Sequence, residues 1–203
     1  MRVAIMQPYL YPYMNYFRLI ARVDLFVLLD TVQFPRRGRV HRAELSGGRW
    51  LTLPLARQPR EVPISALRLA PGGQEAWSAR LAKVPGVAGL PGLSAPLPEL
   101  VLPWLEARLG EVCRLLGIST PFRRASTIPI PGPLTGPARI IALAQALGAT
   151  AYLNLPGGRA LYDPAEFAAA GIRLEFLPPY AGPHGLMLES LATRPAAALR
   201  ADL

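Results

Sequence analysis

Short apolar runs separated by polar or proline-containing breaks dominate the first thirty residues of the chain. Residues 2–7 (RVAIMQ) are closed by a proline, which predicts a short buried strand. Residues 13–23 carry apolar side chains at helical spacing after another proline, which predicts a helix. The continuous apolar run within 24–30 (DLFVLLD) predicts a central parallel strand. Strand, helix and strand in this order form a βαβ unit.

The C-terminal third repeats this rhythm, whereas the middle of the chain is less regular. Strands are predicted at 121–130 (with its exit loop), 150–155 and 172–179, and helices at 136–149 and 163–171. In the middle, a basic loop at 31–42 precedes two predicted strands, at 49–55 and at 64–69, and the second of them is expected at the edge of the sheet. Two predicted helices follow, at 75–83 and 97–116, and a turn-rich loop at 84–96 joins them. Alternating strands and helices predict a Rossmann-like three-layer α/β/α fold with a mostly parallel sheet. The simplest organisation of the 203 residues is a single domain, 1–203.

Composition narrows the class of protein only slightly. Hydrophobic residues make up 51% of the chain, which is ordinary for a globular protein. Cys113 is the only cysteine, which excludes disulfide frameworks and CxxC metal sites and favours a buried core thiol over a nucleophile. The chain shows no signal peptide and no uncharged apolar run of about 18 residues, so we expect a cytoplasmic protein without a membrane span.

The net charge of +9 comes almost entirely from arginine, because Lys83 is the only lysine. A GC-rich genome produces the same skew, so the positions of the arginines are more informative than their number. Seven of them lie between Arg36 and Arg60, where Glu44 is the only acid. This window predicts a basic face that contacts phosphate or another anion.

Four predicted strand exits carry polar or conformationally special residues: 7–9, 30–42, 126–127 and 154–158. The carboxyl ends of parallel strands meet along one edge of a sheet, and ligands of α/β folds bind beyond that edge. The predicted ligand-binding residues are Gln7, Tyr9, Tyr13, Asn15, Tyr16, Gln33, Arg36, Arg37, Arg42, Ser126, Thr127, Asn154, Gly157 and Gly158.

The tyrosines and arginines each have two interpretations. The tyrosines between Tyr9 and Tyr16 could hydrogen bond and stack around a sugar, nucleobase or aromatic ligand. Alternatively, two or three of these rings are core with their hydroxyls at the surface, and Tyr16, inside the predicted helix, fits that role best. The arginines suit bidentate recognition of phosphate or carboxylate, or they belong to a solvated surface.

Asp30 and His41 are the candidate catalytic residues. Asp30 could orient a neighbouring side chain or a ligand hydroxyl, or it could be a loop cap or part of a structural ion pair. His41 could act as a general base, although its arginine-rich loop disfavours protonation. The hydroxyls of 126–127 and the glycine pair 157–158 could contact phosphate, with turn and capping roles as the alternative. No metal-ligand spacing or nucleotide-binding signature is present, so no metal is predicted and no cofactor is identified.

The segments IMQPYLYPYMNYFRLI, VDLFVLLDTVQFPRRGRVHRAEL and ALGATAYLNLPGGRALYD resemble the WbqC-like family of bacterial proteins, and the resemblance spans nearly the whole chain. It implies a role in the synthesis of surface polysaccharide or O-antigen. The chain departs from the family pattern in having Asn15 for Gly, Thr31 for a second Asp, 41–43 (HRA) for Asn-Arg-Asn, and 154–156 (NLP) for Ser-Gly. Loss of the second acid weakens any metal site based on paired carboxylates.

The start of the chain is also distantly similar to nucleotidyltransferase (HUP-type) folds, in which a HxGH motif opens the first helix and contacts phosphates. Tyr13 and Tyr16 would then occupy the two histidine positions, and Asn15 that of the glycine. A tyrosine cannot supply the positive charge of an imidazolium, so this comparison predicts a shared fold and not shared adenylylation chemistry.

These observations predict an enzyme that modifies a sugar or transfers an acyl, aminoacyl or nucleotidyl group in surface polysaccharide synthesis. Its expected partner is an anionic small molecule such as a nucleotide sugar, a nucleotide or an acyl donor, bound at the carboxyl edge of the sheet. The alternative is a non-catalytic ligand-binding or scaffold protein. Nucleic-acid binding is disfavoured because no RRM, KH, HTH or OB signature is present. The sequence does not indicate an oligomeric state.

Overall fold

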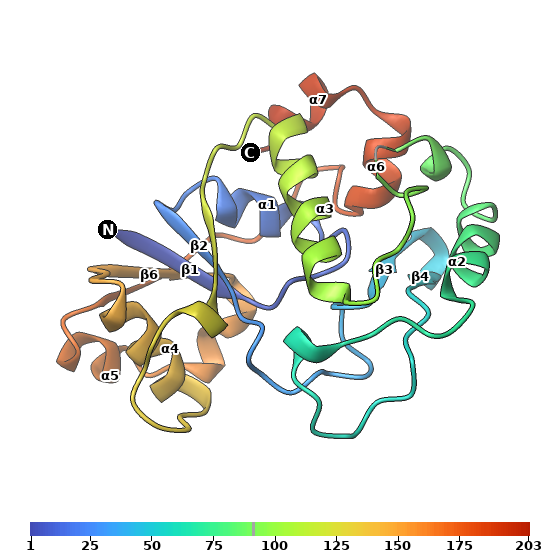
Figure 1. Cartoon of the computed structure of the whole chain (residues 1–203). Helices are drawn as coiled ribbons and strands as arrows, with labels where there is room; N and C mark the ends of the chain where they lie inside the picture. The colour runs from blue at the N-terminus through green and yellow to red at the C-terminus, as the bar shows by residue number, and fades with distance from the viewer. Residues whose placement is uncertain (91) are drawn as a thin grey trace.

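The centre of the protein is a five-stranded parallel sheet, shown by a computed structural model that describes residues 1–90 and 92–203 (Figure 1). Its strands are β1 (Arg2–Met6), β2 (Leu25–Leu28), β5 (Phe122–Arg124), β6 (Ala151–Asn154) and β7 (Arg173–Phe176). Their order is β5-β2-β1-β6-β7, and each neighbouring pair is parallel. The chain thus adds strands on one side of β1 and then returns to add β6 and β7 on the other.

Helices cover both faces of the sheet, which confirms the predicted three-layer arrangement. Helices α1 (Met14–Ile20) and α3 (Val101–Leu115) lie on one face, and α4 (Gly136–Ala146) and α5 (Pro164–Ala169) on the other (Figure 1). Successive side chains of a strand point to opposite faces. Accordingly, Val3 and Ile5 of β1 join the core formed with α4 and α5, whereas Ala4 joins the core formed with α1 and α3.

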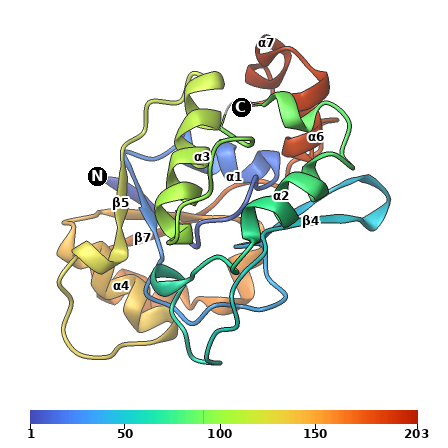
Figure 2. The same cartoon turned by 45° about the vertical axis from the view of Figure 1, so that its right-hand side comes forward.

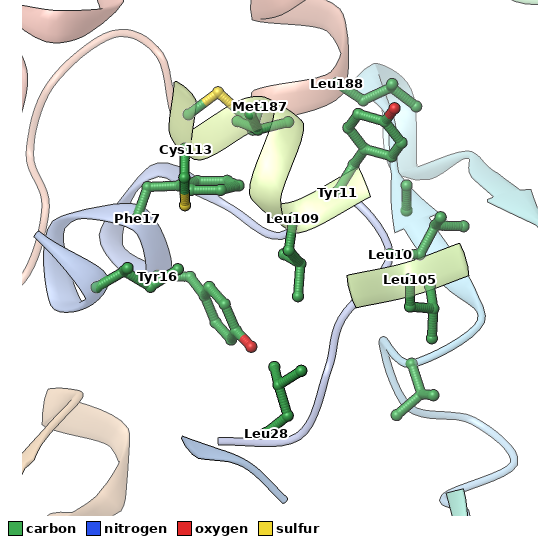
Figure 3. Packing of buried hydrophobic residues seen from close by; sticks show 14 of the residues in the cluster. Leu10, Tyr11, Tyr16, Phe17, Leu28, Leu105, Leu109, Cys113, Met187 and Leu188 are labelled. Atoms are coloured by element: carbon green, nitrogen blue, oxygen red, sulfur yellow. The ribbon is translucent and has the colours of Figure 1, made fainter. Parts of the chain in front are cut away.

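The packing of α1 between the sheet and α3 fixes the position of this helix. Phe17 of α1 and Cys113 of α3 belong to the same buried cluster, and the Tyr16 ring extends toward Leu28 of β2 (Figure 3). All four side chains are buried, as predicted for the thiol of Cys113. The burial of these apolar side chains holds α1 in place against the sheet. The segment that leads into α1 borders the site described below.

A second group of elements lies beside the sheet. Strands β3 (Arg42–Glu44) and β4 (Trp50–Thr52) form an antiparallel hairpin, and α2 (Gly73–Leu81) packs next to it (Figure 2). Helices α6 (Met187–Thr193) and α7 (Ala196–Arg200) follow the last strand of the sheet. Buried side chains of these elements continue the apolar core of α1 and α3 without interruption.

Several predicted elements need correction. The segment 64–69 is not an edge strand but a 3-10 turn (Ile64–Ala66) followed by isolated bridges, because its buried side chains Ile64 and Leu67 are three residues apart rather than two. The strand predicted at 49–55 forms β4, which pairs with β3 at the end of the supposed basic loop, and both strands are outside the parallel sheet. Helices α6 and α7 have no counterpart in the sequence-based prediction.

The turn-rich loop at 84–96 includes residue 91, which lies outside the described residues. Within the described residues no helix has both the length and the apolar character needed to span a bilayer.

Candidate functional site

A pocket of about 350 Å³ opens between the carboxyl ends of β1 and β6. After β1 the chain turns to α1 on one face of the sheet, whereas β6 is reached from α4 on the other face. Such a reversal of strand order leaves a crevice where open α/β sheets bind ligands. We call this the switch-point pocket. Its lining residues are Ile5, Met6, Gln7, Tyr9, Tyr13, Asn15, Leu29, Asn154, Leu155, Pro156, Gly157, Gly158, Leu161 and Tyr162.

A larger hollow of about 690 Å³ lies along α4, but it is a weaker candidate. Its walls are mostly proline, alanine and leucine or isoleucine side chains, with only Thr135, Gln145 and Glu166 as polar groups. Binding sites need polar groups that fix the orientation of a ligand, and the crevice at the strand ends supplies more of them.

Four polar groups of the switch-point pocket have no hydrogen-bond partner among residues 1–90 and 92–203. They are the side-chain amide of Gln7, the hydroxyls of Tyr9 and Tyr13, and Nδ2 of Asn154. None of the four is sealed from solvent or from the cavity. A polar group without a protein partner is satisfied by water or by a ligand, so these four groups are available for recognition.

The tyrosines of the pocket are neutral hydroxyl donors. Burial raises the pKa of Tyr9 and of Tyr13 above the ordinary value, although the nearby Arg39 guanidinium opposes this shift in both cases. Arg39 lies 5.2 Å from the ring centre of Tyr13 and also pairs with Glu44 at 2.6 Å. No lining residue of the pocket carries a charge, so the pocket recognises its ligand through hydrogen bonds and ring contacts.

The position of the Asn154 side chain requires a glycine at position 158. Oδ1 of the buried Asn154 accepts a hydrogen bond from Leu155 N at 2.7 Å, which fixes the amide and leaves Nδ2 toward the cavity. A side chain at Gly158 would collide with this Nδ2, whereas one at Gly157 would meet open space. The second glycine is therefore required by close packing, and the first is not.

Asn15 and Tyr16 follow each other in α1 but have different surroundings. Asn15 lines the pocket, where its Oδ1 accepts from Arg18 Nη1 at 2.8 Å and its Nδ2 donates to Pro178 O at 3.4 Å. Tyr16 is fully buried, and its hydroxyl donates to Gln7 O at 2.7 Å. Tyr16 therefore belongs to the core, and of the two tyrosines compared with the histidine pair only Tyr13 faces the pocket.

Asp30 and Ser126 bind each other instead of lining the pocket. Asp30 is fully buried, and its carboxylate accepts hydrogen bonds from Ser126 N at 2.9 Å and Ser126 Oγ at 2.6 Å. Thr127 Oγ1 donates to Arg124 O at 2.8 Å. The exits of β2 and β5 are thus tied together by their own polar groups, and this geometry gives Asp30 a structural role.

The remaining predicted ligand-binding residues lie on the loop before β3 and on β3 itself. Gln33 donates to Arg60 O at 2.9 Å, Arg36 donates to Gln58 O at 2.8 Å, and Arg37 is exposed. Arg42 donates to Gly38 O at 3.2 Å, and its guanidinium lies 4.6 Å from the Trp50 ring centre. None of these side chains lines the switch-point pocket.

His41 also lies away from the switch-point pocket. Its ring packs edge-on against Phe34, with 4.9 Å between ring centres. Burial, reinforced by the positive charge of Arg42, lowers the pKa of His41 from 6.5 to about 4. The imidazole is therefore neutral at physiological pH, and no described carboxylate hydrogen bonds to it.

The family model of the WbqC-like protein family matches residues 7–84 and 99–184. The chain belongs to the WbqC-like protein family. It is also 28% identical over 187 residues to an uncharacterized protein of Mycobacterium tuberculosis, a match that covers 85% of this chain and 80% of the relative. No solved structure matches the chain significantly.

Within this WbqC-like chain, pattern reasoning missed part of the pocket wall. Leu161 ends the 3-10 helix that contains the glycine pair, and Tyr162 follows it; Met6 ends β1, and Leu29 directly follows β2. Tyr162 could have been found, because it is the tyrosine nearest to the glycine pair in the chain. Among the described residues no group of three or more His, Cys, Asp or Glu side chains could hold a metal ion.

Proposed function

We propose that this WbqC-like protein binds a sugar or nucleobase ring in the switch-point pocket and acts as a transferase on the sugar or acyl donor that carries it. The observation behind the proposal is the set of four unpartnered polar groups at the sheet's switch point, on Gln7, Tyr9, Tyr13 and Asn154. Amide groups and hydroxyls beside aromatic rings suit the hydroxyls and the flat faces of such rings.

The size of the pocket limits how much of a ligand it encloses. Its volume of about 350 Å³ is at the lower end of the range of about 300–1,000 Å³ found for small-molecule sites. It therefore encloses one ring system, and the rest of a nucleotide sugar or an acyl donor extends out of it. The uncharged walls offer no ion pair to a phosphate, so a phosphate of the ligand lies outside the pocket.

The family resemblance supports a role in surface polysaccharide synthesis. A non-catalytic binding protein is the second candidate, because no charged group lines the pocket and its partly buried tyrosines have raised pKa values. If the protein is a transferase, proton transfer falls to a tyrosine hydroxyl or to a group of the ligand itself. Asp30 is hydrogen bonded to Ser126, and His41 lines a different pocket.

The test is ligand-dependent thermal stabilisation, followed by saturation-transfer NMR to identify the ligand atoms in contact. The panel contains hexoses, amino sugars, nucleosides, nucleotides, nucleotide sugars and acyl-coenzyme A compounds. We expect a ring-bearing member to raise Tm, and Tyr13→Phe to weaken its binding about three- to tenfold through loss of one hydrogen bond. A panel without any shift at millimolar concentration would overturn the proposal.

Turnover separates the two candidate functions. The ligand found in the panel is incubated with the protein and a set of sugar or amine acceptors, and the products are separated by chromatography. Formation of a modified acceptor, reduced with Tyr13→Phe, supports the transferase. Binding without any product supports the non-catalytic protein.

A further inference from the structure

A second pocket is lined in part by the loop that precedes β3. Its volume is about 570 Å³, and it opens between this loop, strand β4 with the segment after it, and helix α2, which lies beside β4 (Figure 2). We call it the arginine pocket. The aromatic, basic and amide side chains that line it are Phe34, Arg36, His41, Arg57, Gln58 and Arg80. It shares no lining residue with the switch-point pocket.

Three arginines from three separate segments meet in the arginine pocket, and none of the acidic side chains that the structure describes lines it. Arg36 is held by its hydrogen bond to Gln58 O at 2.8 Å, and Arg80 by a hydrogen bond to Thr52 O. A guanidinium has five N–H donors, so each of these arginines keeps donors for a ligand. Arg57 has no hydrogen bond or ion pair to any residue of 1–90 or 92–203. The pocket thus combines two fixed guanidinium groups with one that is free to close on a ligand.

His41 contributes a neutral donor or acceptor to this group. Its Nδ1 is buried and lacks a hydrogen-bond partner among the described residues. Burial and the neighbouring Arg42 keep its pKa near 4, so the ring adds no positive charge in the absence of an anion. An anion bound beside it would favour the protonated ring, which makes His41 a local reporter of binding.

We propose that the arginine pocket binds the phosphate or diphosphate group of a small molecule. Three arginines without a compensating acid favour an anion with more than one negative charge, and a single carboxylate would balance only one of them. A diphosphate also has enough oxygens to accept from all three guanidinium groups. The site does not depend on the ligand of the switch-point pocket, and either site can fail its test without the other.

The experiment titrates the full-length protein with inorganic pyrophosphate at low ionic strength, followed by calorimetry and by the imidazole NMR signals. The chain has only two histidines, so His184, which pairs with Asp202 at 2.5 Å, serves as the internal control for His41. We expect the His41 signal to shift in a saturable manner while the His184 signal stays in place. We also expect the pKa of His41 to rise in the complex.

Arg57→Gln is the decisive variant, because Arg57 is exposed and its side chain makes no hydrogen bond or ion pair with the described residues, so its replacement should leave the fold intact. It should weaken pyrophosphate binding about tenfold or more, as expected for a lost charge-assisted hydrogen bond. Arg57→Lys keeps the positive charge but not the forked arrangement of donors, so its affinity for pyrophosphate should lie between those of the wild type and Arg57→Gln. Arg114→Gln, which removes an exposed arginine on α3, is the matched control and should bind like the wild type.

Three results would overturn the proposal. One is an equal loss of affinity in Arg57→Gln and Arg114→Gln, which would mean unspecific attraction by the net charge. The second is an unmoved His41 signal at saturating pyrophosphate. The third is binding of short oligonucleotides through Arg57 without any binding of pyrophosphate, which would make the pocket part of a nucleic-acid surface.

Discussion

Asp30 accepts both hydrogen bonds that Ser126 can offer it, from the backbone N at 2.9 Å and from Oγ at 2.6 Å. The two residues are 96 positions apart in the chain, at the ends of the adjacent strands β2 and β5. Because Asp30 is fully buried, these hydrogen bonds offset part of the cost of keeping its polar carboxyl group away from water. The contact therefore joins two distant segments at the sheet edge and stabilises the fold beside the switch-point pocket.

Ser126→Ala tests this contact. The variant removes the hydroxyl that donates to Asp30, and a hydrogen bond to a charged group contributes about 1.5–3 kcal/mol. We expect the free energy of unfolding in urea to fall by about that amount. Ser119→Ala, at an exposed serine, should have little effect. An equal stability of both variants would contradict the structural role of the Asp30–Ser126 pair.

Tyr16→Phe should lower the stability of the protein, whereas Tyr13→Phe should weaken ligand binding. The first removes a buried hydroxyl that donates to Gln7 O, so the free energy of unfolding should fall by about 1–2 kcal/mol. The second removes a hydroxyl without a described protein partner, so stability should stay within about 0.5 kcal/mol while ligand binding weakens. Urea unfolding and the ligand panel together check both outcomes, and a destabilised Tyr13→Phe would show that its hydroxyl is structural.

The glycine pair after β6 provides a second matched comparison. Gly158→Ala places a methyl group against Asn154 Nδ2, so the amide must move and the pocket shrinks. We expect about 1–3 kcal/mol of destabilisation and loss of ligand binding. Gly157→Ala points into open space and should preserve both properties. Thermal unfolding with and without ligand measures the difference, and an unaffected Gly158→Ala would refute the close packing.

His41 predicts how stability depends on pH. Its pKa is about 4 in the folded protein and about 6.5 when unfolded, so between these values the unfolded chain binds more protons. The free energy of unfolding should therefore decrease as the pH falls from about 6.5 to about 4. His41→Gln should reduce this slope, as measured by urea unfolding at several pH values. An unchanged slope would mean that His41 is not buried in its neutral form.

Cys113 should be unreactive in the folded protein. Burial raises its pKa to about 12, against a smaller opposing effect of Arg114, so very little thiolate forms at pH 8. Iodoacetamide should therefore label the native protein far more slowly than the protein in urea. Rapid labelling of the native protein, detected by mass spectrometry, would place the thiol at the surface.

Local patterns were sufficient for most elements of the sheet and its helices. The apolar runs of β1, β2 and β6 and the helical spacing of α4 are properties of short segments, and burial on both faces of a parallel sheet requires such runs. The start of α5 (Pro164–Ala169) also reflects a local pattern, because Asp163 is a residue type that favours N-cap positions and its Oδ1 accepts from Ala165 N at 2.9 Å. Strand β3 and its pairing with β4 escaped prediction, because a three-residue strand carries too little periodicity.

The assignment of candidate residues to particular places required the tertiary structure. Sequence reasoning predicted that four strand exits meet along one edge, but the switch-point pocket opens between those of β1 and β6, with Leu29 as its one contribution from the exit of β2. The reason is that the helices next to β1 and β6 lie on opposite faces of the sheet. Likewise, Tyr13 and Tyr16 are three residues apart, yet the first precedes α1 beside the pocket and the second turns into the core.

The sequence by itself therefore determined the three-layer α/β/α class, the order of the strands and helices that make up the parallel sheet and its two covering layers, and the residue types available for recognition. The tertiary structure alone decided which of these residues share a cavity: neutral amides and tyrosines at the switch point, and arginines in a separate pocket beside β4. The physical reason is that secondary structure follows from the periodicity of neighbouring residues. A binding site, by contrast, depends on strand order and on hydrogen bonds such as Asp30–Ser126, which join residues far apart in the chain.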